Sequence, residues 1–317
     1  MNDRALLVFH SVVSQMEITH DKLWPMCRIF SHLTVILGLS VMTVWAQLKP
    51  VRQADGLQAG QEAYTRGDYS TAMRELSPFA EQGNKEAQFT VGWMYGKTRT
   101  PPNYAQAMKW FRLAAEQGYA NAQLNIGHMY NLGQGTPIDL QEAARWYRLA
   151  AEQAIAEAQL NLGMAYGEGR GVKRNYAEAV KWYRLAATNE YAEHGHAVAE
   201  YDLGAMYYQG LGVPQDRREA AKWFQLAADR GYAEAQYNIG SDYYTGAPLG
   251  QDYVQAYKWF SLALSSATNT PAHVYPPAPS DIAVRAKKWC DILESKMTSA
   301  QLAEARRLTS AWKRIQD

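Results

Sequence analysis

The residues best suited to chemistry stand close together in the stretch YAEHGHAVAE at 191–200. His194 and His196 are separated by one residue, and Glu193 and Glu200 flank them. Two imidazoles and a carboxylate are ligands that zinc or copper accepts. The pattern H-x-H is unspecific, however, and a surface loop tolerates such an insertion freely. We therefore keep His194 and His196 as weak candidates, favour a plain extended loop, and expect no metal site.

A glycine-rich stretch, Gly167 to Gly171, resembles a phosphate-binding loop in composition. Nucleotide motifs require a strand before the glycines and, for the P-loop, Lys-Ser or Lys-Thr after them. Helical patterns flank this stretch, and the Lys-Ser/Thr pair is absent. No serine or cysteine stands in an arrangement typical of a nucleophile. We therefore expect no catalytic residue, no cofactor and no enzymatic activity.

The elements that must position these residues are repeats. The phrase W-[FY]-x-L-A returns at intervals of 36, 36, 41 and 36 residues, beginning at Trp110, Trp146, Trp182, Trp223 and Trp259. A period of about 20 to 50 residues indicates a solenoid or a propeller. The one longer interval contains the histidine insertion.

A second set of markers predicts the first helix of each unit. An alanine is followed five residues later by a glycine, and a tyrosine comes three residues after that. The glycines are Gly92, Gly127, Gly163, Gly204 and Gly240, and the tyrosines are Tyr95, Tyr130, Tyr166, Tyr207 and Tyr243. The alanine, the aliphatic residue before the glycine, and the tyrosine form one helical stripe. Glycine in a helix costs about 1 kcal/mol relative to alanine, so we expect it to make room for the tryptophan of the paired helix.

The second helix of each unit has a clear start signal. Asn103, Asp139, Asn175, Asp216 and Asp252 each stand three residues before a Gln or Glu. This is the capping box, in which the N-cap and N3 side chains satisfy each other's backbone amides. The pattern predicts helix pairs and an all-α fold.

The combined pattern resembles the Sel1-like repeat, a relative of the tetratricopeptide repeat. It is carried by A-x-x-x-L-G-x-x-Y, then G-x-G-V, then D-x-x-x-A-x-x-W-[FY]-x-x-A-A, best preserved at 158–187 and 199–228. The resemblance, to the secreted bacterial type, implies a right-handed α-α superhelix of helix pairs with capping helices at both ends. It also implies a role as an interaction scaffold.

The repeat pattern divides the chain into segments. We expect a degenerate N-terminal capping repeat at 56–83, a proline-rich linker at 268–280 and C-terminal capping helices at 281–317. The five full repeats are placed at about 84–118, 119–154, 155–189, 190–231 and 232–267. The C-terminal segment includes a capping box at Thr298–Gln301 and the remaining cysteine, Cys290, which we interpret as a small buried residue.

The first 46 residues predict export. Residues 29–46 carry no charge, follow Arg28 and end in Val44-Trp45-Ala46, as a secretory signal peptide cleaved after Ala46 does. We assign 26–46 to the signal and 1–25 to an over-extended start, and the expected location is the bacterial periplasm. An uncleaved N-terminal anchor is the alternative; after cleavage no membrane span remains.

The predicted binding surface lies on the first helices, around the marker glycines. The positions two before and one after each glycine are neighbours off the core stripe. The proposed residues are Thr90, Trp93, Asn125, His128, Asn161, Met164, Asp202, Asn238 and Ser241. A constant frame with varied projecting groups suits a concave groove that binds a protein or peptide. The alternative for each position is an ordinary solvent-facing residue, with the asparagines bonded to nearby backbone.

Charge and cysteine content bear on two further function classes. A net charge of +1 does not favour nucleic-acid binding. A cell-wall-fragment or glycan-binding protein, or an enzyme of the envelope, is the alternative to a scaffold, as proposed for cysteine-rich relatives. Those relatives carry a disulfide in each repeat, whereas this chain has only Cys27 and Cys290.

Overall fold

The computed structural model describes residues 56–98, 101–189, 196–269 and 280–316. These residues are helical, with turns and loops between the helices and no strand among them. The predicted signal peptide, the start segment, His194 and most of the proline-rich linker lie outside the described residues. His196 enters only as the first residue of a helix.

Two compact units divide the chain, residues 1–76 and residues 77–317. The described part of the first unit contains a helix at 56–65 and the start of α3 (Tyr69–Glu81). Gly60 lets these two segments approach, since a Cβ there would lie 2.7 Å from the Leu76 side chain. The degenerate repeat therefore retains a helix pair.

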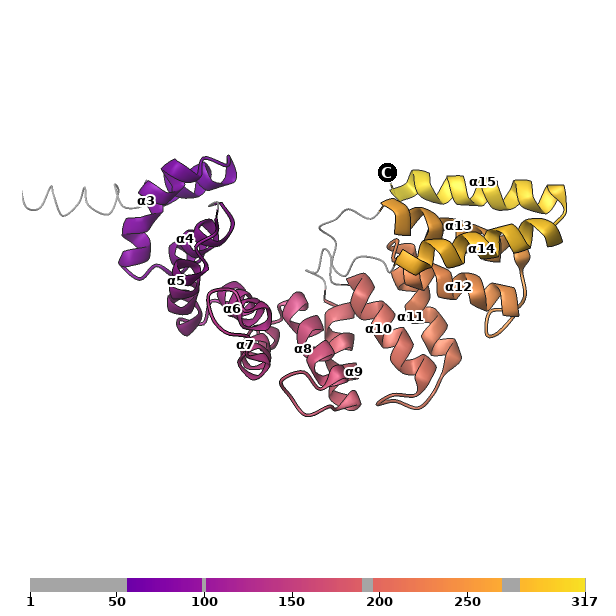
Figure 1. The fold of residues 1–317 in the computed structure, drawn as a ribbon, viewed down its shortest axis with the longest axis horizontal. Helices are drawn as coiled ribbons and strands as arrows, with labels where there is room; N and C mark the ends of the chain where they lie inside the picture. The colour runs from indigo at the N-terminus through magenta and orange to yellow at the C-terminus, as the bar shows by residue number, and fades with distance from the viewer. Residues whose placement is uncertain (1–55, 99–100, 190–195, 270–279, 317) are drawn as a thin grey trace, which may run out of the picture. The chain divides into compact units, whose positions relative to one another are not determined.

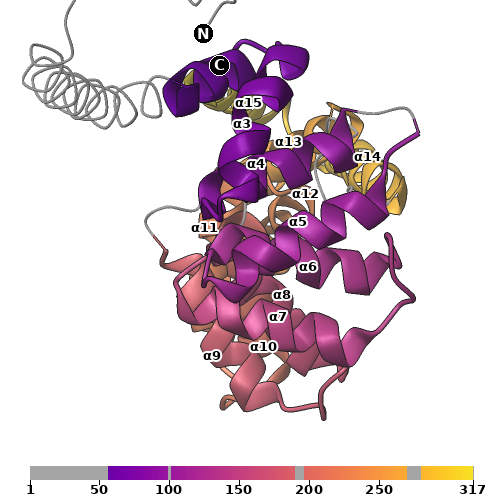
Figure 2. The same ribbon diagram turned by 90° about the vertical axis from the view of Figure 1, so that its left-hand side faces the viewer.

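The second unit consists of helices packed in consecutive pairs (Figures 1 and 2). The first helix of each pair, called helix A, is α4 (Lys85–Lys97), α6 (Ala120–Leu132), α8 (Ala156–Glu168), α10 (His196–Gln209) or α12 (Ala233–Thr245). The second, helix B, is α5 (Tyr104–Glu116), α7 (Leu140–Glu152), α9 (Tyr176–Ala187), α11 (Arg217–Asp229) or α13 (Tyr253–Asn269). Each helix B before α13 also packs against the helix A that follows it, so the core continues from pair to pair.

The marker glycines make room for the residue after the tryptophan. A Cβ on Gly127 would lie 2.5 Å from the Tyr147 ring, and one on Gly163 would lie 2.7 Å from the Tyr183 ring. The equivalent ring belongs to a phenylalanine in the other three repeats. The expectation that the glycine accommodates the tryptophan was therefore wrong, because the tryptophan faces a different neighbour.

The tryptophans pack between successive repeats. Trp182 joins the cluster built around Leu124, Tyr147 and Leu162 of the preceding pair and its own. Trp259 packs in the same way against the α11–α12 cluster. These two are buried, whereas the other three are half-buried.

The N-caps form as the sequence predicts, with one difference. Asp139 accepts hydrogen bonds from the Gln141 and Glu142 amides at 3.0 Å, and the other four caps act similarly. The N-cap amide itself donates to a marker tyrosine carbonyl, as Asp139 does to Tyr130 at 3.0 Å. A main-chain carbonyl therefore replaces the N3 side chain as the acceptor for the N-cap amide. At Thr298 the N3 side chain does accept, since the Thr298 amide donates to Gln301 at 2.9 Å.

The glycine-rich loops owe their composition to close main-chain contact. Gly171 has φ +70°, and a Cβ there would lie 1.9 Å from the Leu140 carbonyl oxygen of the preceding helix B. Gly135 and Gly212 meet Tyr104 and Tyr176 in the same way. Packing of one repeat on the next thus explains the G-x-G pattern.

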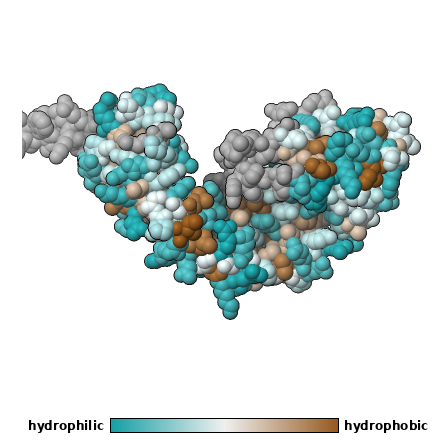
Figure 3. Space-filling model, in the orientation of Figure 1, coloured by the Kyte–Doolittle hydropathy of each residue, from teal (hydrophilic) through white to brown (hydrophobic). Residues whose placement is uncertain are grey.

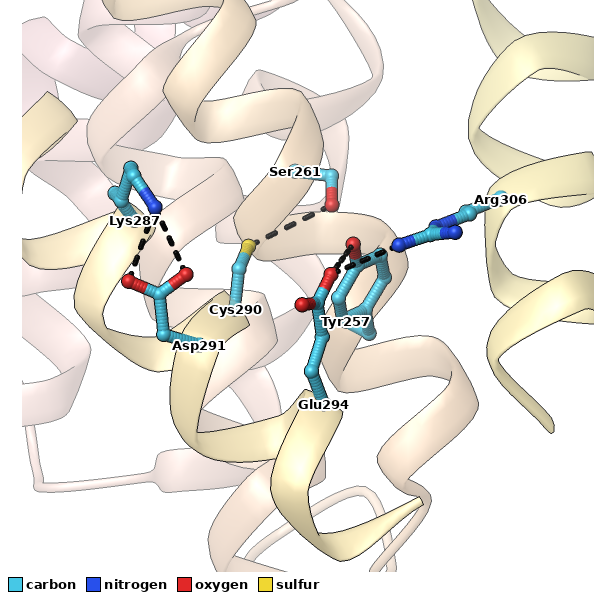
Figure 4. A network of polar contacts seen from close by, with 7 residues as sticks. All are labelled: Tyr257, Ser261, Lys287, Cys290, Asp291, Glu294 and Arg306. Carbon is cyan, nitrogen blue, oxygen red and sulfur yellow. Dashed lines mark hydrogen bonds and ion pairs between the residues drawn. The ribbon is translucent and has the colours of Figure 1, made fainter. Parts of the chain in front are cut away.

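The C-terminal helices α14 (Ser280–Lys296) and α15 (Ser299–Gln316) both pack on α13. Glu294 of α14 accepts hydrogen bonds from Tyr257 at 2.8 Å and from Arg306 at 3.0 Å, so it links all three helices (Figure 4). The free thiol of Cys290 is buried next to Ser261, and burial raises its pKa. These contacts close the end of the repeat core.

Candidate functional site

The predicted binding residues lie on the five A helices, and we call this set the A-helix face. It comprises Thr90, Trp93, Asn125, His128, Asn161, Met164, Asp202, Asn238 and Ser241, all in the second unit. On the side of the molecule in Figure 3, most side chains of the described helices are hydrophilic and apolar ones lie in small separate areas.

Three of these residues bond to their own helix. The Asn125 amide donates to the Asn121 carbonyl at 2.8 Å, and the Asn161 amide to the Glu157 carbonyl at 2.9 Å. The Thr90 hydroxyl donates to Glu86 at 2.9 Å. For the two asparagines this backbone bonding is the alternative to a binding role, and each side-chain carbonyl oxygen is an acceptor that a partner can use.

The apolar residues of the A-helix face pack against the core. Trp93 is half-buried against the α5–α6 cluster, and Met164 is half-buried against the α9–α10 cluster. Asn238 bonds the Tyr201 hydroxyl of the preceding helix A, and Ser241 is half-buried on α12. Their remaining exposed surface offers small apolar and polar contacts.

A first polar network links the second and third repeats. His128 Nε2 lies 3.0 Å from Glu157 Oε1, and His128 Nδ1 lies 3.1 Å from the Tyr147 hydroxyl. The His128 and Tyr147 rings meet edge to face at 5.4 Å between centroids. The hydrogen bond from His128 lowers the pKa of the Glu157 carboxyl. Both nitrogens of the imidazole are thus held by helices of adjacent repeats.

A second polar network surrounds Asp202. Its carboxyl forms a hydrogen bond with the Tyr183 hydroxyl and interacts with the negative charge of Glu168 nearby. Burial, and then that charge, raise the pKa of Asp202 to about 7. Burial also raises the pKa of Tyr183. The rings of Tyr147 and Tyr183 thus contact the marker glycines in the core, while their hydroxyls take part in the polar networks. Phenylalanine in the other repeats has no hydroxyl for the second role.

Two ladders of hydrogen bonds between helices were not predicted. Buried glutamines Gln88, Gln123, Gln159 and Gln236 each donate to the carbonyl of an alanine eight residues earlier, in the last turn of the preceding B-type helix. In the fourth repeat Glu200 takes this position, is 2% exposed, and is held by Arg230 Nε at 3.2 Å from both carboxylate oxygens. The other ladder joins an arginine two residues after the tryptophan to the next marker tyrosine: Arg112 to Tyr130, Arg148 to Tyr166 and Arg184 to Tyr207. Both ladders were visible as recurring Gln and Arg, but only the structure shows their partners.

The site offers groups suited to binding. Within the described ranges, no group of three or more His, Cys, Asp or Glu side chains is placed to hold a metal ion. The polar networks hold carboxylates, an imidazole and phenols in fixed positions, which suits recognition of a partner's donors.

The repeat is a known one. A model of the Sel1 repeat matches residues 85–119, 120–154, 156–191, 197–232 and 233–266. The chain belongs to the Sel1 repeat family. Sel1 repeat proteins generally act as protein-interaction scaffolds and are generally not enzymes.

Two solved Sel1-type structures are similar to this chain. One is a protective antigen present in uropathogenic Escherichia coli strains, which displays an SLR fold. It is 32% identical, with a TM-score of 0.68 over 82% of this chain and 53% of the antigen, so this chain spans about half of the antigen's length. The other is a Sel1 repeat protein from Oxalobacter formigenes. It is 32% identical, with a TM-score of 0.61 over 75% of this chain and 96% of that protein. No curated protein matches the chain.

None of the helices in the described ranges combines the length and the apolar character that crossing a bilayer requires.

Proposed function

We propose that this Sel1 repeat protein is a non-catalytic scaffold that binds a protein or peptide segment on its A-helix face. The observation that carries the proposal is the contrast between the repeated marker residues and the varied A-helix face. The marker glycines, tyrosines and N-caps recur in each of the five repeats. The position next to the glycine changes from Trp93 to His128 to Met164. A segment lying across the A helices would meet a different side chain at each step.

The two polar networks favour a partner that presents hydrogen-bond donors. Glu157 and the asparagine carbonyls accept from lysine, arginine or backbone amides, while Trp93 and Met164 provide apolar contact. Because His128 and Asp202 are already held by tyrosines, they lose little side-chain freedom on binding. Noncovalent binding of a partner therefore needs no rearrangement of the helix pairs.

A pair of arginine substitutions tests this surface. Asn161→Arg places a bulky charge in the middle of the A-helix face, and Gln141→Arg adds the same charge at an exposed site on α7. We expect chemical crosslinking and affinity purification from an envelope extract to recover the same partner with wild type and Gln141→Arg, and to lose it with Asn161→Arg. Equal recovery with both variants would contradict the proposal, as would specific binding or turnover of cell-wall fragments by the purified protein.

We also propose export to the periplasm, with cleavage after Ala46. The support is the uncharged run 29–46 followed by the small-residue cleavage pattern. With a tag at Asp317, fractionation should find the shortened product in the periplasm. A full-length cytosolic product would contradict cleavage, and a full-length membrane-bound product would favour the anchor.

A further inference from the structure

The leucine of the W-[FY]-x-L-A phrase is exposed in four repeats and buried in the fifth. Leu113, Leu149, Leu185 and Leu226 are 37–45% exposed, whereas Leu262 is only 1% exposed. The preceding tryptophan follows the same trend at the two ends, half-buried for Trp110 and 3% exposed for Trp259. Something covers this position only in the last repeat.

In this repeat the chain's own helix α15 packs on α13. Trp312 packs against the cluster that contains Trp259 and Leu262. It is also the neighbour of Gly231, the glycine after α11, with its Cη2 3.9 Å from the position of a Cβ there. We call this surface the last groove; it lies between the end of α11 and α13. An indole from an amphipathic helix fills it.

The equivalent surface at the other end of the second unit is open. We call it the first groove, formed by Ala80, Glu81, Gly83, Trp110, Leu113 and Glu116 between the last turn of α3 and α5. It holds a cavity of about 580 Å³. Gly83 corresponds to Gly231, and no atom of the described chain lies within 4 Å of a Cβ placed on it. No described residue fills the space here that Trp312 fills in the last groove.

The charge around the first groove favours a basic occupant. Glu81 and Glu116 are exposed at its rim, and neither forms an ion pair within the described part of the chain. Lys109 supplies one positive charge, so the lining is negative on balance. Helix α15 has matching chemistry. Its inward stripe is Leu302, Ala305, Leu308, Thr309 and Trp312, and its other faces carry Arg306, Arg307 and Lys313.

We propose that the first groove is a docking site for a basic amphipathic helix of a partner protein, anchored by an aromatic side chain that lies on Trp110 and Leu113. The last groove has Trp259 and Leu262 in the places of Trp110 and Leu113, and such a helix packs on it. The first groove shares no residue with the A-helix face, so this proposal does not depend on the proposed function and can fail independently of it. Burial of a large aromatic anchor at the centre of the groove would dominate the affinity.

The test uses the full-length chain and a labelled peptide with the sequence of α15, residues 299–316. The peptide carries four basic residues and one acidic residue. Fluorescence anisotropy measures its binding to wild type, to Leu113→Glu and to Gln106→Glu. Gln106 is exposed on the same helix but does not line the groove, so it controls for the added charge. A second peptide carries Trp312→Ala.

We expect saturable binding to wild type and to Gln106→Glu. Binding should be at least about tenfold weaker with Leu113→Glu and with the Trp312→Ala peptide, since each removes the anchor contact. Absence of binding, or equal binding to Leu113→Glu, would overturn the proposal, because the peptide would then sit elsewhere or nowhere. A photo-crosslinker at position 113 identifies the occupant directly. Capture of the peptide supports the proposal, whereas capture of residues 1–55 or of a second copy of the chain overturns it.

Discussion

Replacement of Gly127 by alanine tests the packing rule that holds each helix pair together. The added Cβ would lie 2.5 Å from two carbons of the Tyr147 ring. Ordinary carbon contacts are about 3.5–4.0 Å long. The ring cannot move away freely, because Tyr147 is buried and its hydroxyl bonds His128 at 3.1 Å. The clash must therefore separate α6 from α7 or distort the tyrosine.

The size of the effect follows from two opposing contributions. Overpacking a well-packed core costs roughly 1–3 kcal/mol, and a fixed ring at this distance belongs at about the upper end. Replacing glycine by alanine in a helix returns about 1 kcal/mol. We expect Gly127→Ala to lower the free energy of unfolding by about 2 kcal/mol. Gly96→Ala is the matched control, because its Cβ would meet only Ala107, at 3.5 Å; this variant should be neutral or more stable by up to about 1 kcal/mol.

Urea unfolding followed by circular dichroism measures both changes. The substitution Tyr147→Leu supplies the decisive background, since a smaller side chain leaves space for the new methyl group. In that background Gly127→Ala should cost less than about 1 kcal/mol. The reasoning fails if Gly127→Ala is as stable as wild type, or if its cost is the same in both backgrounds.

Three further predictions concern single residues. Ala154 has φ +62° where the equivalent Gly118 has φ +81°, so Ala154→Gly should raise the free energy of unfolding by up to about 1 kcal/mol; a lower urea midpoint would count against this. Because the pKa of Asp202 is raised to about 7, the folded chain holds a proton that the unfolded chain releases above about pH 4. The stability from that proton is complete below about pH 4 and is lost as the pH rises to about 7, so Asp202→Asn should flatten the fall of the urea midpoint between pH 5 and pH 8; unchanged slopes would contradict it. Arg230→Ala leaves the buried Glu200 carboxylate without its guanidinium and should cost about 2 kcal/mol, a value kept low because Arg230 is half exposed; a thermal scan showing no loss would refute it.

Much of the fold was predictable because it rests on local rules. The period of the tryptophans predicted the repeats, the alanine–glycine–tyrosine stripe predicted helix A, and Asp139 and its equivalents predicted the start of helix B. The helix A stripe and the helix B cap each act within about ten residues of chain, where helical periodicity and capping geometry decide the outcome.

The candidate site was less predictable. The sequence selected the right helices, since every residue of the A-helix face lies on a helix A. It left open whether Asn161 bonds the backbone of its own helix, and it did not show that Asp202 reaches Tyr183 of the preceding helix B. Asp202 and Tyr183 lie 19 residues apart in the chain, and only the packing of their two helices brings the side chains together.

By itself the sequence determined the family, the helix pairs and the order of the units, because repeated short-range patterns encode them. Only the tertiary structure decided which ring packs against each marker glycine and that Glu200 forms an ion pair with Arg230. It also decided why Leu262 is buried while Leu113 is exposed. The last case is the clearest. The two leucines stand in the same local phrase, but only Leu262 belongs to a cluster on which Trp312 packs, a residue 50 positions further along the chain. Burial depends on what packs against a residue from elsewhere, and local sequence does not contain that information.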